Sequence, residues 1–423
     1  MAGIREKINQ ARQSSDAKTV ASNFAWLTLL QVAGYVFPLI TLPYLARIIG
    51  VDGFSKIAFA TAIMIWIQTI ADWGFNMSAT RDVAQNRDNP DKVSRIFSNV
   101  LWARLLLMLV SFVILVLLVA TVPKLRENAA VIMVTFLMIP GHIMFPDWFF
   151  QAMEKMKYIT ILNVLMKFLF TVAVFVFIRT PEDYILQPLL NSLSFAVCGA
   201  AALYIIVARW HVSIRRPVFS EILRTIREST DIFINNLMPN LYNSFSTMLL
   251  GFWGAPGAVG ILDGGNKFVQ IGNQLLFTLS RAFYPYLSRR YDGHKTFLYI
   301  TISTASAICI VLFAAAPLIV RLFLSPEFAD SAWVIRIRAI SLVFYAIANA
   351  YGANYLIVRH HERLLRRITT YCSLAGFCLA WPLVYFYGYI GASLTVTISL
   401  GLLALTCWLA ARKVGKENES LCS

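Results

Sequence analysis

The chain has 423 residues, of which 58% are hydrophobic and only 14% are charged. Soluble domains carry about 25% charged residues, so this composition excludes an ordinary soluble protein and favours a membrane protein. A net charge of +15 would suggest a nucleic-acid partner in a soluble protein, but the apolar content takes precedence here and we expect none.

Apolar runs close to the length of about 20 residues that crosses a bilayer recur along the whole chain. We predict twelve membrane helices, at residues 20–46, 55–80, 96–120, 129–151, 159–179, 184–208, 229–251, 259–284, 297–320, 332–357, 368–388 and 391–411. The polar N-terminus has no small-residue cleavage site before a short apolar core, so the first run is predicted to be an uncleaved membrane helix. The expected fold class is an all-α polytopic membrane protein.

The orientation follows from the positions of Lys and Arg, because positively charged loops stay on the cytoplasmic side. Most of the 37 basic residues lie in the N-terminus, the even-numbered connections and the C-terminus. Both termini are therefore predicted to be cytoplasmic.

An internal repeat divides the chain into two halves. LARIIGVDGFSKIAF begins at residue 45 and LLGFWGAPGAVGILD at residue 249, and an offset of 204 pairs Gly50 with Gly254 and Gly53 with Gly257. Six helices in each half give both halves the same orientation, as in transporters built from parallel repeats. We predict an N-terminal lobe (residues 1–208), a basic cytoplasmic linker (209–228), a C-terminal lobe (229–411) and a cytoplasmic tail (412–423).

Polar side chains form stripes on three of the predicted helices. They are Gln68, Asp72 and Asn76 on the second, Asn236, Asn240 and Asn243 on the seventh, and Asn266, Gln270 and Asn273 on the eighth, beside an Asp263–Lys267 pair. Polar groups in hydrocarbon are costly and normally face the bundle interior or a water-filled cavity. The stripes could join helices through hydrogen bonds, but their number favours a cavity lining suited to sugar hydroxyls.

Basic residues inside the spans outnumber acidic ones. They are Arg104, Lys167, Lys267, Arg281, Arg336 and Arg338, against Asp72, Asp147 and Asp263. Arg104, Lys167 and Asp72 are expected about 12 Å from the cytoplasmic end of their helices. An Asp72–Arg104 ion pair is one alternative, which would leave Lys167 available. Arg336 and Arg338 are two residues apart on one helix, so they cannot face the same way. The positive surplus indicates an anionic substrate.

Several kinds of chemistry have no signature in the sequence. No nucleotide-binding, nucleophile or metal-ligand motif is present, and the six cysteines form no CxxC pair, so we predict no cofactor and no metal. Short periplasmic loops argue against an integral-membrane glycosyltransferase or polymerase. Pro38 and Pro43 in the first span and Pro239 in the seventh are either packing kinks or bending points for alternating access.

The segment PDWFFQAMEKMKYITILNVLMK, residues 146–167, resembles the P-x-W-F-F-Q-G-x-E-x-M-x-x-I segment of Wzx-type bacterial O-antigen and polysaccharide flippases. These proteins belong to the multidrug/oligosaccharidyl-lipid/polysaccharide (MOP) exporter superfamily. Supporting matches are residues 23–50, DWGFNMSATRDVA at 72–84 and PEDY at 181–184. The likeness covers the whole first half and extends weakly into the second.

The resemblance implies a transporter of twelve helices in two lobes, not an enzyme, in the bacterial inner membrane. Its substrate would be an undecaprenyl-pyrophosphate-linked oligosaccharide, held around a cationic cavity. Its other partners would be the lipid bilayer, a polysaccharide polymerase and a chain-length regulator. Coupling to an ion gradient would make Asp72, Asp147 and Asp263 candidate titrating groups. The alternatives are a cation-coupled small-molecule exporter of the same fold and a membrane glycosyltransferase or polymerase.

Overall fold

The computed structural model describes residues 26, 28–289 and 294–422, and the described chain is helical without a β-strand. Within these residues, nine helices are long and apolar enough to cross a membrane. The protein is therefore a multi-pass membrane protein of the all-α class that the composition predicts.

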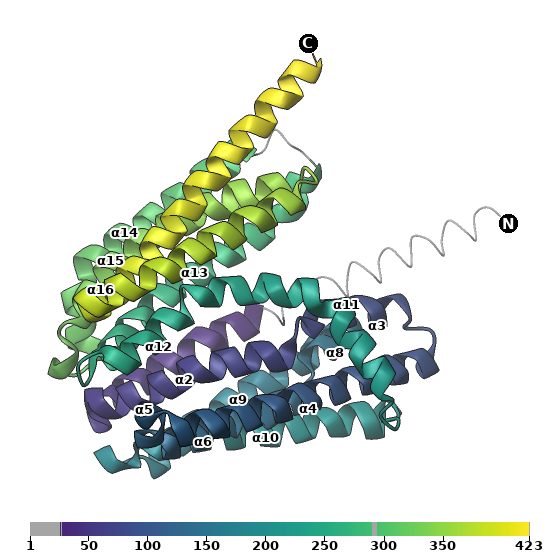
Figure 1. Cartoon of the computed structure of the whole chain (residues 1–423), viewed down its shortest axis with the longest axis horizontal. Coiled ribbons are helices and arrows are strands. Elements are labelled where there is room, and N and C mark those ends of the chain that lie inside the picture. The colour runs from purple at the N-terminus through teal and green to yellow at the C-terminus, as the bar shows by residue number, and fades with distance from the viewer. Residues whose placement is uncertain (1–25, 27, 290–293, 423) are drawn as a thin grey trace.

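The first half of the chain is a bundle of helices that lie side by side (Figure 1). Its elements are a first helix Thr28–Ile48, α2 (Gly50–Asp72), α3 (Phe75–Gln85), α4 (Pro90–Thr121), α5 (Pro123–Glu127), α6 (Ala129–Phe136), α7 (Met138–Met144), α8 (Asp147–Ala152), α9 (Met156–Phe177), η1 (Pro181–Ile185), α10 (Leu186–Tyr204) and η2 (Ile205–Arg209). The predicted fourth span is divided among α6, α7 and α8. Residues 1–25, where the predicted first span begins, lie outside the described residues.

The second half forms a separate group of long helices. Its elements are α11 (Phe219–Leu237), η3 (Met238–Leu241), α12 (Ser244–Trp253), α13 (Ala258–Arg289), α14 (His294–Phe323), η5 (Pro326–Phe328), α15 (Ser331–Tyr351), η6 (Gly352–Ile357) and α16 (Glu362–Cys422). The second part of the predicted linker is the beginning of α11, and α16 continues through most of the predicted tail.

Four of the predicted spans in the second half take a different form in the described chain. The seventh span is interrupted by η3, because Pro239 cannot donate an amide hydrogen bond within a helix. The eighth is covered by α13, whose polar side chains lower its hydropathy although its 32 residues are long enough. The last two lie in α16 on either side of Gly388, whose φ of 55° and ψ of −128° are not helical.

The two halves are packed together at one end of the molecule. Val51 N–H at the start of α2 donates to Glu327 Oε2 over 2.9 Å, and the rings of Phe54 and Phe328 meet edge to face at 5.5 Å. Glycine permits close packing here, because a Cβ on Gly260 would lie 2.6 Å from the Val51 carbonyl oxygen. We call this the closed end.

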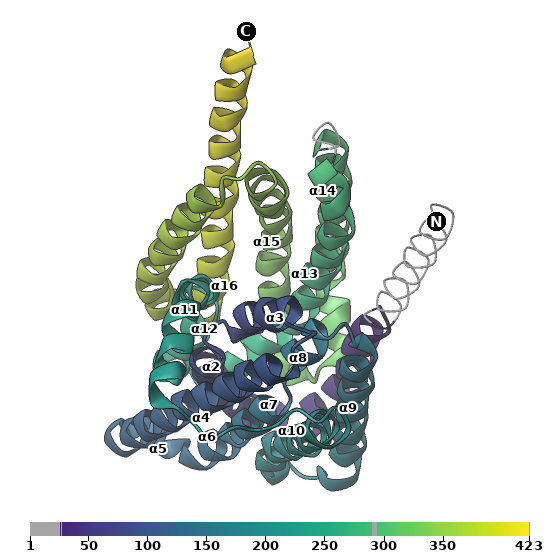
Figure 2. The same cartoon turned by 90° about the vertical axis from the view of Figure 1, so that its right-hand side faces the viewer.

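The halves diverge away from the closed end. Figures 1 and 2 show α13 to α16 leaning away from the first bundle toward the end at which the chain's C-terminus lies. Helix α11 crosses the first bundle, where the Trp73 and Phe233 rings stack 3.9 Å apart and the hydroxyls of Ser78 and Ser229 are 2.8 Å apart. This second-half helix is therefore anchored on the first half.

Candidate functional site

The second predicted span is broken in the middle of its polar stripe. Helix α2 ends at Asp72, and Trp73 (φ 40°) and Gly74 (φ 77°) are both left-handed before α3 begins. Gly74 is required because a Cβ would lie 2.7 Å from Ile232 Cγ2 on α11. The expectation of one continuous helical face through Gln68, Asp72 and Asn76 is therefore wrong, and the chain turns between Asp72 and Asn76.

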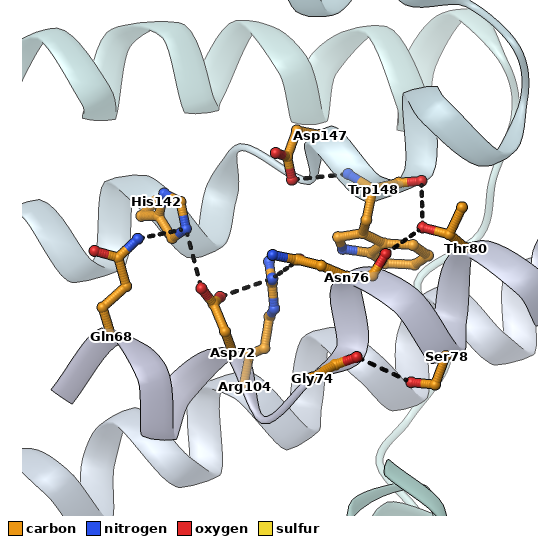
Figure 3. Close-up of polar contacts among 10 residues, drawn as sticks. All are labelled: Gln68, Asp72, Gly74, Asn76, Ser78, Thr80, Arg104, His142, Asp147 and Trp148. Atoms are coloured by element: carbon orange, nitrogen blue, oxygen red, sulfur yellow. Dashed lines mark hydrogen bonds and ion pairs between the residues drawn. The ribbon is translucent and has the colours of Figure 1, made fainter. Parts of the chain in front are cut away.

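Arg104 of α4 bridges this break (Figure 3). Its Nη2 donates to Asp72 Oδ1 over 2.8 Å and to Asn76 Oδ1 over 2.7 Å. The side chain is 1% exposed, and its Nε and Nη1 are buried without a hydrogen-bond partner among the described residues. The Asp72–Arg104 ion pair that the sequence left as one alternative is formed.

His142 of α7 completes this cluster. Its Nε2 lies 3.4 Å from Asp72 Oδ2 and 3.0 Å from the Gln68 amide nitrogen. Nε2 without a hydrogen accepts from the Gln68 amide, whereas Nε2 that carries a hydrogen donates to Asp72, so the two bonds require different tautomers of the ring. Sequence reasoning missed His142 because histidines were considered only as metal ligands. An ionisable residue inside a predicted span was the available signal.

A cavity of about 430 Å³ lies beside the cluster, between α2 and the end of α11. Its lining residues are Ile65, Gln68, Thr69, Asp72, Asn235, Asn236, Pro239 and Asn240. Asn240 Nδ2 donates to Thr69 Oγ1 over 2.9 Å and so connects the two walls. Two residues of the predicted seventh-helix stripe thus line the cavity, while Asn243 directly precedes α12, makes no capping hydrogen bond there and is not part of the lining.

The predicted site residues of α13 lie outside this cavity. Lys267 Nζ pairs with Asp263 Oδ2 at 3.2 Å. Asn266 Oδ1 accepts from Arg338 Nε over 3.0 Å, and Arg338 is 7% exposed with Nη1 unpartnered among the described residues. Gln270 is exposed, and Asn273 Oδ1 is buried without a hydrogen bond in the described chain. None of these side chains lines the 430 Å³ cavity.

The remaining candidates have separate environments. The Arg336 guanidinium lies 5.0 Å from the Trp333 ring centroid and Arg281 lies 4.6 Å from that of Phe277. Arg336 and Arg338 therefore have different surroundings, as their two-residue spacing predicts. Lys167 is partly exposed and forms no hydrogen bond or ion pair with a described residue. Asp147 Oδ1 accepts from the Trp148 N–H over 2.8 Å at the start of α8.

The cluster joins polar groups by short contacts but has no group of ligands for a metal. No set of three His, Cys, Asp or Glu side chains that could hold a metal ion occurs among the described residues. What the arrangement offers is a buried guanidinium, a carboxylate and an imidazole behind a cavity lined with amides. Such groups can form hydrogen bonds with a polar or charged ligand.

Comparisons with known proteins agree with this architecture. The family described as polysaccharide biosynthesis protein matches residues 20–291. A protein of Escherichia coli (strain K12) named "Putative O-antigen transporter" is 25% identical over 382 residues, which cover 88% of this chain and 92% of that protein.

Two solved structures share the fold. Lipid II flippase MurJ in an inward closed conformation has a TM-score of 0.74 at 12% identity, covering 93% of this chain and 87% of that one. An inward-facing multidrug resistance MATE family transporter of the MOP superfamily has a TM-score of 0.73 at 14% identity, covering 95% and 100%. The chain therefore has the fold of these MOP exporters.

Proposed function

Because the chain belongs to the polysaccharide biosynthesis protein family, we propose that it flips an undecaprenyl-pyrophosphate-linked oligosaccharide across the bacterial inner membrane. The cargo is an O-antigen or related repeat unit, which moves from the cytoplasmic to the periplasmic leaflet. Its diphosphate and sugar hydroxyls cannot cross about 30 Å of hydrocarbon without polar partners. The relative named as an O-antigen transporter and the fold shared with a lipid II flippase support this proposal.

The observation that carries the proposal is the polar cavity lined in part by Asp72, the ion-pair partner of Arg104. Its amide and hydroxyl groups come from Gln68, Thr69, Asn236 and Asn240, and these suit the hydroxyls of a sugar. Arg104 keeps two buried nitrogens without partners in the described chain. A guanidinium with free donors favours a phosphate oxygen, because it offers several N–H groups in a fixed geometry.

The arrangement of the halves supports transport by alternating access. The closed end carries the loop before η5, which is predicted to be periplasmic, and the diverging end is predicted to be cytoplasmic. The structure then corresponds to an inward state that receives cargo from the cytoplasmic leaflet. Both solved structures compared above are also in inward conformations. Opening the closed end would release the head group outside, where a polymerase and a chain-length regulator would act on it.

A deletion strain tests the proposal. We expect lipid-linked repeat units to accumulate on the cytoplasmic leaflet, and the wild-type gene to restore surface polysaccharide. Arg104→Gln should restore it poorly, whereas Arg281→Gln, which changes an arginine that takes no part in the Asp72 cluster, should restore it fully at equal expression. Normal surface polysaccharide in the deletion strain would reject the proposed function.

A second candidate function is cation-coupled export of small molecules. The shared fold with a multidrug resistance transporter favours it, and a cavity of about 430 Å³ lies within the size range of small-molecule sites. Deletion would then increase sensitivity to toxic compounds while surface glycans stay intact. The same strain therefore distinguishes the two functions.

A further inference from the structure

A second cavity lies between α11 and α16, apart from the cluster around Asp72. It has a volume of about 320 Å³ and is lined by Asp231, Ile234, Arg366, Arg367, Thr370 and Tyr371. Arg366 and Arg367 follow the first residue of α16, Glu362, by four and five positions, so they lie within about 8 Å of the helix start. This is the end of α16 that is predicted to lie at the cytoplasmic membrane surface.

The charges of this cavity are unbalanced. Arg366 Nη1 lies 3.7 Å from Asp231 Oδ1, and Asp231 is the only acidic residue of the lining. Arg367 forms no ion pair or hydrogen bond with any residue that the structure describes. The Arg367 guanidinium is therefore available to an anion. Among the described residues, the Arg366 guanidinium has only the 3.7 Å contact with the Asp231 carboxylate, which is 85% exposed.

Apolar surface continues from the cavity along the helix. Ile234 is 40% exposed, Tyr371 is 70% exposed, and Leu374, one turn beyond Thr370 and Tyr371, is 46% exposed. In a membrane protein such exposed apolar side chains contact lipid. The site therefore places cations at the membrane surface and apolar groups deeper, which is the order of polarity within a lipid with a phosphate head group.

We propose that this cavity binds the phosphate head group of a membrane lipid, with Arg367 and Arg366 on the phosphate and Ile234 and Leu374 along the chain. Guanidinium groups bind phosphate oxygens through paired hydrogen bonds, and basic pockets between membrane helices on the cytoplasmic side bind anionic head groups. The hydroxyl of Tyr371 adds a donor, whereas the Thr370 hydroxyl already donates to the Arg366 carbonyl oxygen.

The location of the cavity connects it to transport. Asn235 and Asn236, which directly follow Ile234 on α11, line the cavity beside Asp72. The same turn of α11 thus borders both cavities. If the bound lipid is the lipid-linked cargo, this is a loading site for it; that part rests on the proposed function, whereas phosphate-lipid binding does not.

The test measures lipid binding by the full-length protein in phosphatidylcholine nanodiscs. The probes are undecaprenyl phosphate, phosphatidylglycerol and inorganic pyrophosphate, and binding is followed by native mass spectrometry. The Arg366→Gln/Arg367→Gln double variant should lose at least about tenfold in affinity for the lipids, which corresponds to about 1.4 kcal/mol. Arg363→Gln, an exposed arginine of the same helix outside the cavity, should bind as wild type does.

The probes separate the sources of the phosphate. Tighter binding of undecaprenyl phosphate than of phosphatidylglycerol supports a loading site, whereas equal binding supports a site for anionic lipids in general. Competition by pyrophosphate shows that the head group provides most of the affinity. Equal lipid binding by the double variant and by Arg363→Gln would overturn the proposal. If the double variant unfolds, Arg367→Gln alone provides the same comparison. A deletion strain with normal polysaccharide would reject the flippase and leave lipid binding untouched.

Discussion

Arg104 and Asp72 form a largely buried ion pair, with side-chain exposures of 1% and 17%. Removal of one partner of such a pair is costly because the other charge stays buried. We predict that Asp72→Asn destabilises the protein by about 3 to 5 kcal/mol. Asp263→Asn removes the partner of the more exposed Lys267 and should cost about 1 kcal/mol or less. Thermal unfolding of the purified variants compares the two, and equal losses would contradict this prediction.

Glu154 and Arg87 pair at 2.9 Å between the loops after α8 and α3. The hydrogen bond from Arg87 holds the pKa of the Glu154 carboxyl below its usual value of 4.5. A carboxyl whose pKa is lowered by folding stabilises the protein at neutral pH, and this contribution disappears as the pH falls through the folded-state pKa. Glu154→Gln should therefore lower the melting temperature slightly at pH 7, since an exposed pair contributes about 1 kcal/mol at most.

The pH dependence of the difference in melting temperature tests this explanation for Glu154. Wild type and Glu154→Gln should have converging melting temperatures once the pH is well below 4.5, where the glutamate is protonated in both the folded and the unfolded state. A difference that stays constant over this range would mean that the variant acts through packing and not through the carboxylate.

At the scale of elements, the break between α2 and α3 depends on Gly74. Its φ is 77°, and a Cβ there would lie 2.7 Å from Ile232 on α11. Gly74→Ala should destabilise the protein by more than about 1 kcal/mol through the left-handed backbone alone. Gly34→Ala is the matched control, because no heavy atom lies within 4 Å of its Cβ position in the first helix. That change should be neutral or stabilising by up to about 1 kcal/mol, and a similar loss in both variants would reject the explanation.

At the scale of the whole molecule, Glu327 connects the two halves at the closed end. Its carboxylate accepts the Val51 N–H at the N-terminus of α2, where a helix favours negative charge. Glu327→Ala should shift the population toward states in which this end is open. Spin labels at Glu182 and Ala255, exposed positions on the two halves, should then report longer distances in a cysteine-free background.

Asp330 provides the control for this measurement. It lies three residues after Glu327 but accepts the Tyr389 hydroxyl over 3.0 Å within its own half. Asp330→Ala should therefore leave the distance between the two labels unchanged. Identical distance distributions in the Glu327→Ala and wild-type proteins would show that the contact does not hold the closed end.

Apolar length and the positions of glycine and proline determined much of the fold from the sequence alone. A long apolar run identifies a membrane helix without knowledge of what packs against it. The reason is that backbone groups in lipid must form their hydrogen bonds within the segment, which a helix allows. The repeat pattern singled out Gly50, whose φ is 65°, and Pro239 was expected to kink the seventh span, which η3 interrupts at this residue. The break after Asp72 escaped prediction, because it depends on the approach of Ile232, 158 residues away along the chain.

The candidate site was only partly readable from the sequence. Spacing predicted a similar depth for Asp72 and Arg104 in the membrane and singled out the amides of the seventh span. Only the tertiary structure decided that Arg104 bridges Asp72 and Asn76, that His142 joins them, and that Arg281 and Arg336 lie against aromatic rings instead. Helical periodicity fixes the height and direction of a side chain on its own helix, but its partner depends on how helices distant in sequence are rotated and packed together.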